Sequence, residues 1–136
     1  MIEISKTKFS AMYWHEELSL TELHWTNQES EEMKEKDYKE ALLTCLGLVQ
    51  SYKPSSFLLN SENIIFPITT ELQEWVDENI SLPTNTIIKK MAVIMPKTLI
   101  EQLSMEQVFD EKEAQKYETQ FFPNYQDAFN WLTNCN

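Results

Sequence analysis

The sequence predicts a single α/β domain over residues 1–136, with a mixed β-sheet of about five strands covered by helices. The length of 136 residues suits one domain and allows a core to be buried without disulfides or metals. The apolar share of 42% is high enough for burial to offset the conformational entropy lost on folding. Segments with strand-like and helix-like apolar spacing also alternate along the chain, as in α/β folds.

The N-terminal part of the chain predicts a β-hairpin. Residues 10–15 and 18–25 are both rich in aromatic and β-favouring side chains. The polar pair Glu16 and Glu17 separates them, so we expect the chain to turn there.

A helix and a buried strand are expected next. Apolar residues recur at three- and four-residue steps over 38–52, which predicts one apolar helix face, and Lys53 and Pro54 are expected to end that helix. The short apolar run 57–59 predicts a buried strand. A helix that joins two strands of one sheet implies that those strands are parallel.

The middle of the chain predicts a second helix and a central strand. Thr70 and Gln73 form a capping-box pair before the apolar face of a helix, and Pro83 is expected to close that segment. The segment 87–95 alternates and then becomes continuously apolar, which is typical of a strand buried on both faces.

Three further helices and an edge strand are expected towards the C-terminus. Two capping boxes predict two short helices, and they pair Thr98 with Glu101 and Ser104 with Gln107. The segment 117–122 predicts an edge strand that ends at a proline, and 125–132 has the spacing of a closing amphipathic helix.

The charge balance excludes several classes of partner. The chain has 22 acidic and 11 basic residues, a net charge of −11, and every basic residue is lysine. Nucleic-acid binding depends on clustered positive charge and draws heavily on arginine, so we expect no DNA or RNA partner. An anionic membrane would repel the same surface.

Membrane insertion and export are not expected either. No apolar run reaches the roughly 20 residues that span a bilayer, and residues 1–10 lack the plan of a signal peptide. The two cysteines, Cys45 and Cys135, form no disulfide framework, so a cytoplasmic protein with free thiols is expected. The one glycine, Gly47, falls inside a helical pattern, which excludes the glycine-rich loops that hold nucleotides.

From about residue 57 to residue 132 the chain resembles the STAS domains, the SpoIIAA-like family of anti-sigma-factor antagonists, and most of all its uncharacterised bacterial branch. Three local features carry the resemblance: the strand 57–60 followed by a helix capped by Thr69 or Thr70, the strand 90–94, and a C-terminal pattern made of Phe122, Ala128, Trp131 and Leu132. The resemblance implies a SpoIIAA-like α/β fold and a regulatory role.

In the sigma-factor antagonists a serine at the start of the second helix, preceded by Asp and often followed by Gly, is phosphorylated by the partner kinase. Here Thr69 and Thr70 keep a hydroxyl at that place, but the Asp and Gly of the motif are missing. The start of this helix and that of the helix expected at Thr98 should lie near the C-terminal ends of parallel strands, where ligands dock in open α/β sheets. The candidate ligand or phospho-switch residues are therefore Ser61, Thr69, Thr70, Lys97 and Thr98, with ordinary helix caps and a solvated lysine as the alternative.

Histidine and cysteine chemistry gives weaker candidates. His15 and His24 fall near the ends of the hairpin and could meet Glu16, Glu17 or Glu22 at a metal, but the spacing is not that of a zinc site. Two partly exposed strand histidines are the alternative. Cys45 belongs to the apolar helix face, where a buried thiol is inert. We therefore expect no metal, no cofactor and no enzymatic activity.

The aromatic residues of the hairpin suggest an interface instead. Aromatic side chains are enriched at the centres of protein interfaces, and a small domain cannot bury all of them, so Tyr13, Trp14 and Trp25 are the candidate interface residues. The sequence thus predicts a non-catalytic regulatory or protein-interaction domain, whose partner is another protein or a second copy of this chain. The alternative is a small-molecule or lipid-binding domain with an apolar pocket beside the second helix, lined by Phe57, Phe66, Ile68 and Trp75.

Overall fold

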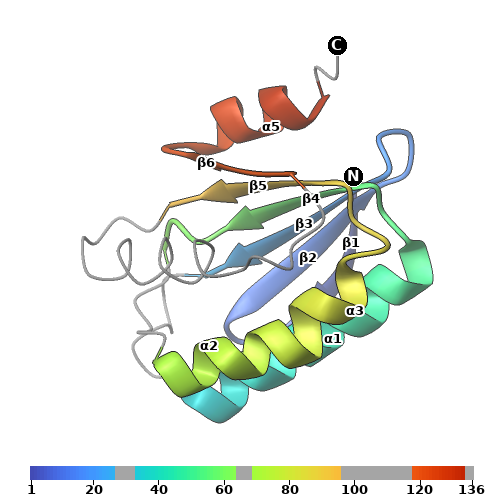
Figure 1. Ribbon diagram of the computed structural model, residues 1–136. Helices are drawn as coiled ribbons and strands as arrows, with labels where there is room; N and C mark the ends of the chain where they lie inside the picture. Colours follow the sequence, from blue (N-terminus) through green and yellow to red (C-terminus); the bar gives the residue numbers. More distant parts are fainter. Residues whose placement is uncertain (27–32, 64–68, 96–117, 134–136) are drawn as a thin grey trace.

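The computed structural model describes residues 1–26, 33–63, 69–95 and 118–133 and contains one six-stranded sheet. The spatial order follows the sequence: β1 (Ile2–Lys6), β2 (Ser10–His15), β3 (Leu20–Trp25), β4 (Ser56–Asn60), β5 (Lys90–Ile94) and β6 (Glu118–Phe122) (Figure 1). The first three strands pair antiparallel, and β3 to β6 pair parallel. The predicted α/β class, the mixed sheet and the edge position of β6 are therefore confirmed.

The sheet has one strand more than expected because β1 was not predicted. Its five residues pair antiparallel with β2, with an irregularity in register between Glu3 and Ser5. Ile4 packs against the core, whereas Ile2 is exposed. A short edge strand with so little burial has only a weak alternating pattern.

The predicted hairpin is confirmed, but its second strand begins two residues later than expected. Ser19 adopts a left-handed backbone with φ 50, and its N–H donates to the carbonyl of Glu16 at 3.2 Å. The turn therefore includes Leu18 and Ser19, and β3 starts at Leu20.

The first helix, α1 (Glu35–Tyr52), starts a turn before the predicted 38–52. Its N-terminus is capped by the side chain of Asp37, whose carboxylate accepts the backbone N–H of Lys34 at 3.0 Å. Its predicted end is confirmed, because Lys53 turns left-handed at φ 51 and donates its N–H to the carbonyl of Val49. Gly47 lies inside the helix, as predicted.

The second helical segment corrects one prediction and confirms another. It comprises α2 (Thr70–Val76), the π-helical turn η2 (Asp77–Ser81) and α3 (Leu82–Thr84). The N-cap is Thr69, whose Oγ1 accepts the N–H of Leu72 at 3.2 Å, so the predicted Thr70–Gln73 capping box was wrong. The segment ends at Thr84, one residue after Pro83, so its predicted end is confirmed to within one residue.

Pro83 lies inside a continuous right-handed helical run, just after the π-helical turn η2. A proline there has no N–H to donate to the preceding turn, which disrupts the regular α-helical hydrogen bonds. The carbonyls around it find another donor, because the Thr84 hydroxyl donates to the carbonyls of Ile80 at 2.9 Å and Ser81 at 3.1 Å.

The helices lie on both faces of the sheet and bury two clusters. Helices α1, α2 and α3 cover one face and α5 (Tyr125–Thr133) covers the other (Figure 1). The larger cluster, under α1 and α2, includes Leu23, Trp25, Tyr38, Phe57 and Leu72. The smaller one, under α5, comprises Leu20, Leu58, Ala92, Ile94, Ala128 and Leu132.

The closing helix over 125–132 is confirmed as α5, whereas the two short helices predicted after Thr98 lie outside the described residues. Within the described ranges, the helices are all too short or too polar to cross a membrane.

Candidate functional site

A carboxylate lies buried at the centre of the sheet face that α5 covers. Glu22, on β3, is only 1% exposed, and it shares its face with Leu20 of the smaller core. Its Oε2 accepts hydrogen bonds from His15 Nε2 of β2 and from the Tyr125 hydroxyl of α5, both at 2.7 Å. Its Oε1 accepts one from His24 Nε2 at 2.6 Å. Three side-chain donors from three elements thus surround one carboxylate.

Asn60 of β4 contacts the other ring nitrogen of His24. The backbone N–H of Glu62 donates to Oδ1 of Asn60 at 3.0 Å, which fixes the orientation of that amide. Asn60 therefore presents Nδ2, a donor, to His24 Nδ1 at 3.0 Å. In this arrangement His24 Nδ1 contacts Asn60 and His24 Nε2 contacts Glu22, so both ring nitrogens are engaged.

The hydrogen bonds decide the charge of Glu22. Burial raises the pKa of its carboxyl, but the hydrogen bonds from His24, Tyr125 and His15, together with the electrostatic attraction of His24, lower that pKa below the ordinary value of 4.5. Burial of the Tyr125 ring and the hydrogen bond to Glu22 raise the pKa of Tyr125, so its hydroxyl stays a donor. At neutral pH Glu22 is therefore an ionised carboxylate held by three side-chain donors.

Aromatic rings close over this network. Tyr125 stacks on Phe129 with ring centroids 5.6 Å apart and lies 5.8 Å from the ring of His24. Phe129 in turn lies 5.8 Å from His15, and Tyr13 meets His24 edge-on at 5.6 Å. The network therefore ties α5 to the antiparallel part of the sheet, beyond the strands that its apolar face covers.

His15 connects the buried network to an open groove of about 320 Å³. The lining residues, which we call the β1/turn groove, are Met1, Ile2, Trp14, His15, Glu16, Glu17 and Leu18. The Nε2 of His15 is committed to Glu22, so Nδ1 is the remaining polar atom of its ring. The groove thus has apolar walls, two exposed carboxylates and the imidazole of His15, which is held in place by its hydrogen bond to Glu22.

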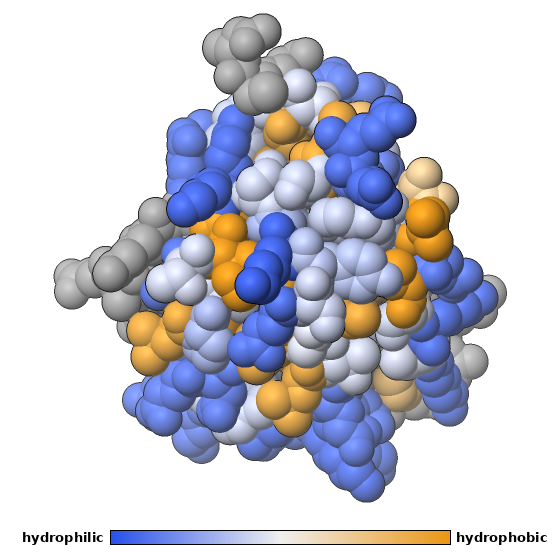
Figure 2. Space-filling view, turned by 90° about the vertical axis from the view of Figure 1, so that its right-hand side faces the viewer, coloured by the Kyte–Doolittle hydropathy of each residue, from blue (hydrophilic) through white to orange (hydrophobic). Residues whose placement is uncertain are grey.

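Exposed apolar side chains gather around this groove. The described residues include six large exposed apolar side chains, namely Met1, Ile2, Leu18, Leu43, Tyr52 and Leu82. Three of them line the groove, and Tyr52 packs on Trp14 with ring centroids 5.0 Å apart. Figure 2 views the molecule from the side where the N-terminus and the β2–β3 turn lie, and apolar groups there form separate patches among hydrophilic ones.

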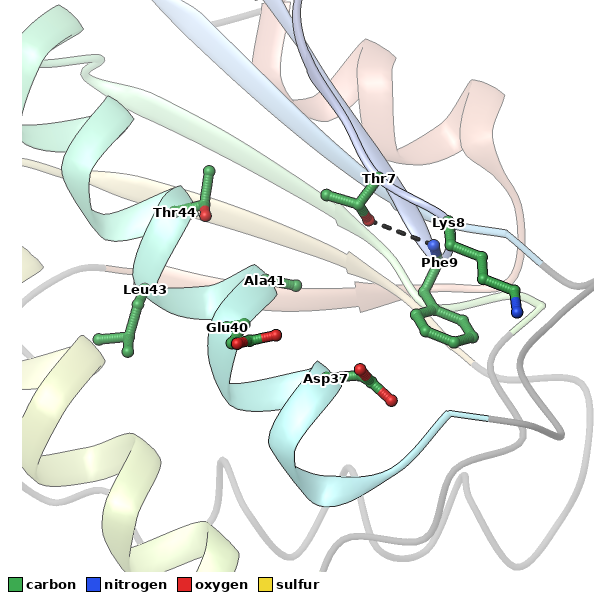
Figure 3. Close-up of a pocket in the computed structure, with 8 residues that line it drawn as sticks. All are labelled: Thr7, Lys8, Phe9, Asp37, Glu40, Ala41, Leu43 and Thr44. Carbon is green, nitrogen blue, oxygen red and sulfur yellow. Dashed lines mark hydrogen bonds between the residues drawn. The ribbon is translucent and has the colours of Figure 1, made fainter.

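A second open groove, of about 560 Å³, lies between the β1–β2 turn and α1. Thr7, Lys8 and Phe9 line it from the turn, and α1 contributes Asp37, Glu40, Ala41, Leu43 and Thr44 (Figure 3). The Thr7 hydroxyl accepts the N–H of Phe9 at 3.2 Å, and the Lys8 ammonium lies 5.7 Å from the ring of Phe9. One basic and two acidic side chains line this groove, and nothing in its geometry indicates a particular ligand.

The predicted ligand or phospho-switch residues lie in different environments where the structure describes them. Ser61 is fully buried, and within the described part of the chain its hydroxyl has no hydrogen-bond partner. Thr69 and Thr70 are exposed, and Thr69 serves as the N-cap of α2. Lys97 and Thr98 lie outside the described residues. The phospho-switch stays a prediction, and the cap explains Thr69 by itself.

The three candidate interface residues lie in different environments. Trp25 is 3% exposed, and its ring stacks on that of Tyr38 with centroids 5.2 Å apart. It therefore belongs to the core and is no longer a candidate interface residue. Tyr13 and Trp14 are both half-buried and, as neighbours on β2, point to opposite faces of the sheet. Of the three, Trp14 lines the β1/turn groove.

One residue predicted to line a pocket beside the second helix, Phe57, belongs to the hydrophobic core instead. Phe57 is 4% exposed, and Trp75 packs, partly buried, against the same cluster. Phe66 and Ile68 lie outside the described residues. Cys45 is buried as predicted, and burial raises the pKa of its thiol to about 12, which keeps it protonated.

The histidines do meet Glu22, as one sequence alternative allowed, but through hydrogen bonds. No group of three or more candidate ligands with metal-binding geometry occurs in the described part of the chain. Glu16 and Glu17 stay exposed at the turn. The contributions of Asn60 and Tyr125 were missed. The spacing of Glu22 and His24 on one strand face was the local signal, whereas Tyr125 is 103 positions from Glu22 and gave none.

Comparison of the chain with protein-family models, with curated proteins and with solved structures gives no significant match.

Proposed function

We propose that this chain is a non-catalytic regulatory or protein-interaction domain with a STAS-like fold, and that it binds its partner through the β1/turn groove. The sequence resemblance supports the STAS-like part of the proposal. A mixed sheet with helices on both faces is compatible with it.

The single observation that carries the proposal is the gathering of apolar side chains around Trp14. Leu18 is 42% exposed and Ile2 is 60% exposed, next to a half-buried tryptophan. Scattered exposed apolar residues are ordinary on a monomer, but a set that shares one hollow with an aromatic residue has the composition of an interface centre. Glu16 and Glu17 supply the polar rim.

The proposal is tested by site-specific photo-crosslinking in the cells that produce the protein. A benzophenone amino acid replaces Leu18 in one variant and Leu43, exposed on α1, in the control. We expect a defined crosslinked protein from position 18 and none from position 43. The identified partner, which includes a second copy of this chain as one outcome, is then purified.

Binding of that partner is measured with the Leu18→Asp and Leu82→Asp variants. Both residues are exposed, so neither change empties the core. We expect Leu18→Asp to weaken binding by at least about tenfold, the loss typical of an interface anchor, and Leu82→Asp to leave it unchanged. Crosslinks that are the same at positions 18 and 43 would contradict the proposal.

A further inference from the structure

The β1/turn groove also indicates what kind of side chain it receives, and this inference rests on the proposed function. We propose that the groove binds an arginine side chain of a partner protein, with the guanidinium between the turn carboxylates and Trp14.

Three kinds of group in the groove favour a guanidinium. Glu16 and Glu17 are exposed at the turn and offer carboxylate oxygens, which pair with a guanidinium through two hydrogen bonds. Trp14 offers an aromatic ring, on which arginine stacks better than lysine does. Ile2 and Leu18 provide apolar walls for the aliphatic part of the side chain.

The net charge of the chain also favours a basic partner, and its composition shows which protein must supply the arginine. The net charge of −11 attracts a basic partner over longer distances. Because this chain has no arginine, a second copy of itself cannot supply the side chain. The occupant is therefore another protein.

The test is a two-dimensional NMR titration of ¹⁵N-labelled protein with three small probes: N-acetyl-arginine methylamide, its citrulline analogue and its lysine analogue. Citrulline has the shape of arginine without the charge. We expect saturable shifts of the Trp14 indole N–H and of the turn amides, with arginine binding about fivefold more tightly than citrulline and more tightly than lysine.

A matched pair of variants separates local binding from overall charge. The double change Glu16→Gln and Glu17→Gln removes two charges at the groove, and Glu71→Gln with Glu74→Gln removes two exposed charges on α2. We expect only the first pair to weaken the binding of the arginine probe, by about threefold or more. Equal binding of arginine and citrulline or lysine, or equal loss in both pairs, overturns the inference. The crosslinking result at position 18 is independent of these titrations, so either proposal can fail alone.

Discussion

At the scale of single residues, the buried Glu22 is the most constrained group of the described chain. Its carboxylate has lost nearly all contact with water, and three donors at 2.6–2.7 Å replace that water. Removing one partner of such a group leaves the others unsatisfied, which costs more than the net gain of any one hydrogen bond.

We expect Glu22→Gln to lower the free energy of unfolding by about 3 kcal/mol at pH 7, since the amide nitrogen would face the donor of a histidine or of Tyr125. Glu71→Gln, on an exposed helix face, is the control and should change stability by less than about 0.5 kcal/mol. Urea unfolding of the three proteins gives these differences. A loss of less than about 1 kcal/mol for Glu22→Gln would contradict the assigned network.

The same substitution has a defined pH dependence. The pKa of Glu22 is lower in the folded chain than its ordinary value of 4.5, so the unfolded state binds the proton more tightly. The stability contributed by ionised Glu22 is therefore fully present above pH 4.5 and is lost as the pH falls through the folded pKa. In urea melts between pH 7 and pH 3, the difference in free energy of unfolding between wild type and Glu22→Gln should decrease only below pH 4.5. A constant difference would contradict the lowered pKa.

Gly47 offers the opposite change, a gain in stability. It lies inside α1 at ordinary helical φ, and a Cβ added there meets no atom within 4 Å. Gly47→Ala should therefore raise the free energy of unfolding by about 1 kcal/mol, because alanine loses less backbone entropy in a helix. Gly47→Ser, with lower helix propensity, should gain only about half as much. Thermal unfolding measures both, and destabilisation by alanine would show that the site is functionally or sterically constrained.

At the scale of elements, α5 holds together the parallel half of the sheet and the Glu22 network. Its inner face contributes Ala128 and Leu132 to the smaller core, and Tyr125 reaches Glu22. Trp131 is only half-buried; its ring lies 5.6 Å from that of Phe122, and the Lys90 ammonium lies 4.1 Å from its centroid.

The burial of α5 predicts unequal effects of two alanine substitutions. Leu132→Ala should cost about 3 kcal/mol, because it empties a site that is 5% exposed. Trp131→Ala should cost about 1–2 kcal/mol, because part of that ring is already in contact with water. Denaturant melts of both variants check this order. Equal losses below about 1 kcal/mol would mean that α5 does not dock as described.

At the scale of the whole molecule, the charge sets the class of partner. A chain with a net charge of −11 and no arginine has no patch that can neutralise phosphates, so we expect no band shift on duplex or single-stranded DNA or RNA at about 150 mM salt. Electrophoresis and fluorescence anisotropy test this. Submicromolar binding at that salt concentration would contradict this prediction, since such binding is tighter than ordinary non-specific binding.

The sequence by itself determined the α/β class, the helices α1 and α5 and most strands of the sheet, because apolar spacing reports which face of an element is buried. It also determined the acidic, arginine-free surface. Weakly patterned elements were not predicted: β1 is short and mostly exposed, and the π-helical turn η2 was not anticipated. Only the tertiary structure decided the partners of Glu22. His15, His24, Asn60 and Tyr125 meet it because β2, β3, β4 and α5 converge there, and hydrogen bonds between residues up to 103 positions apart leave no periodic trace in a sequence.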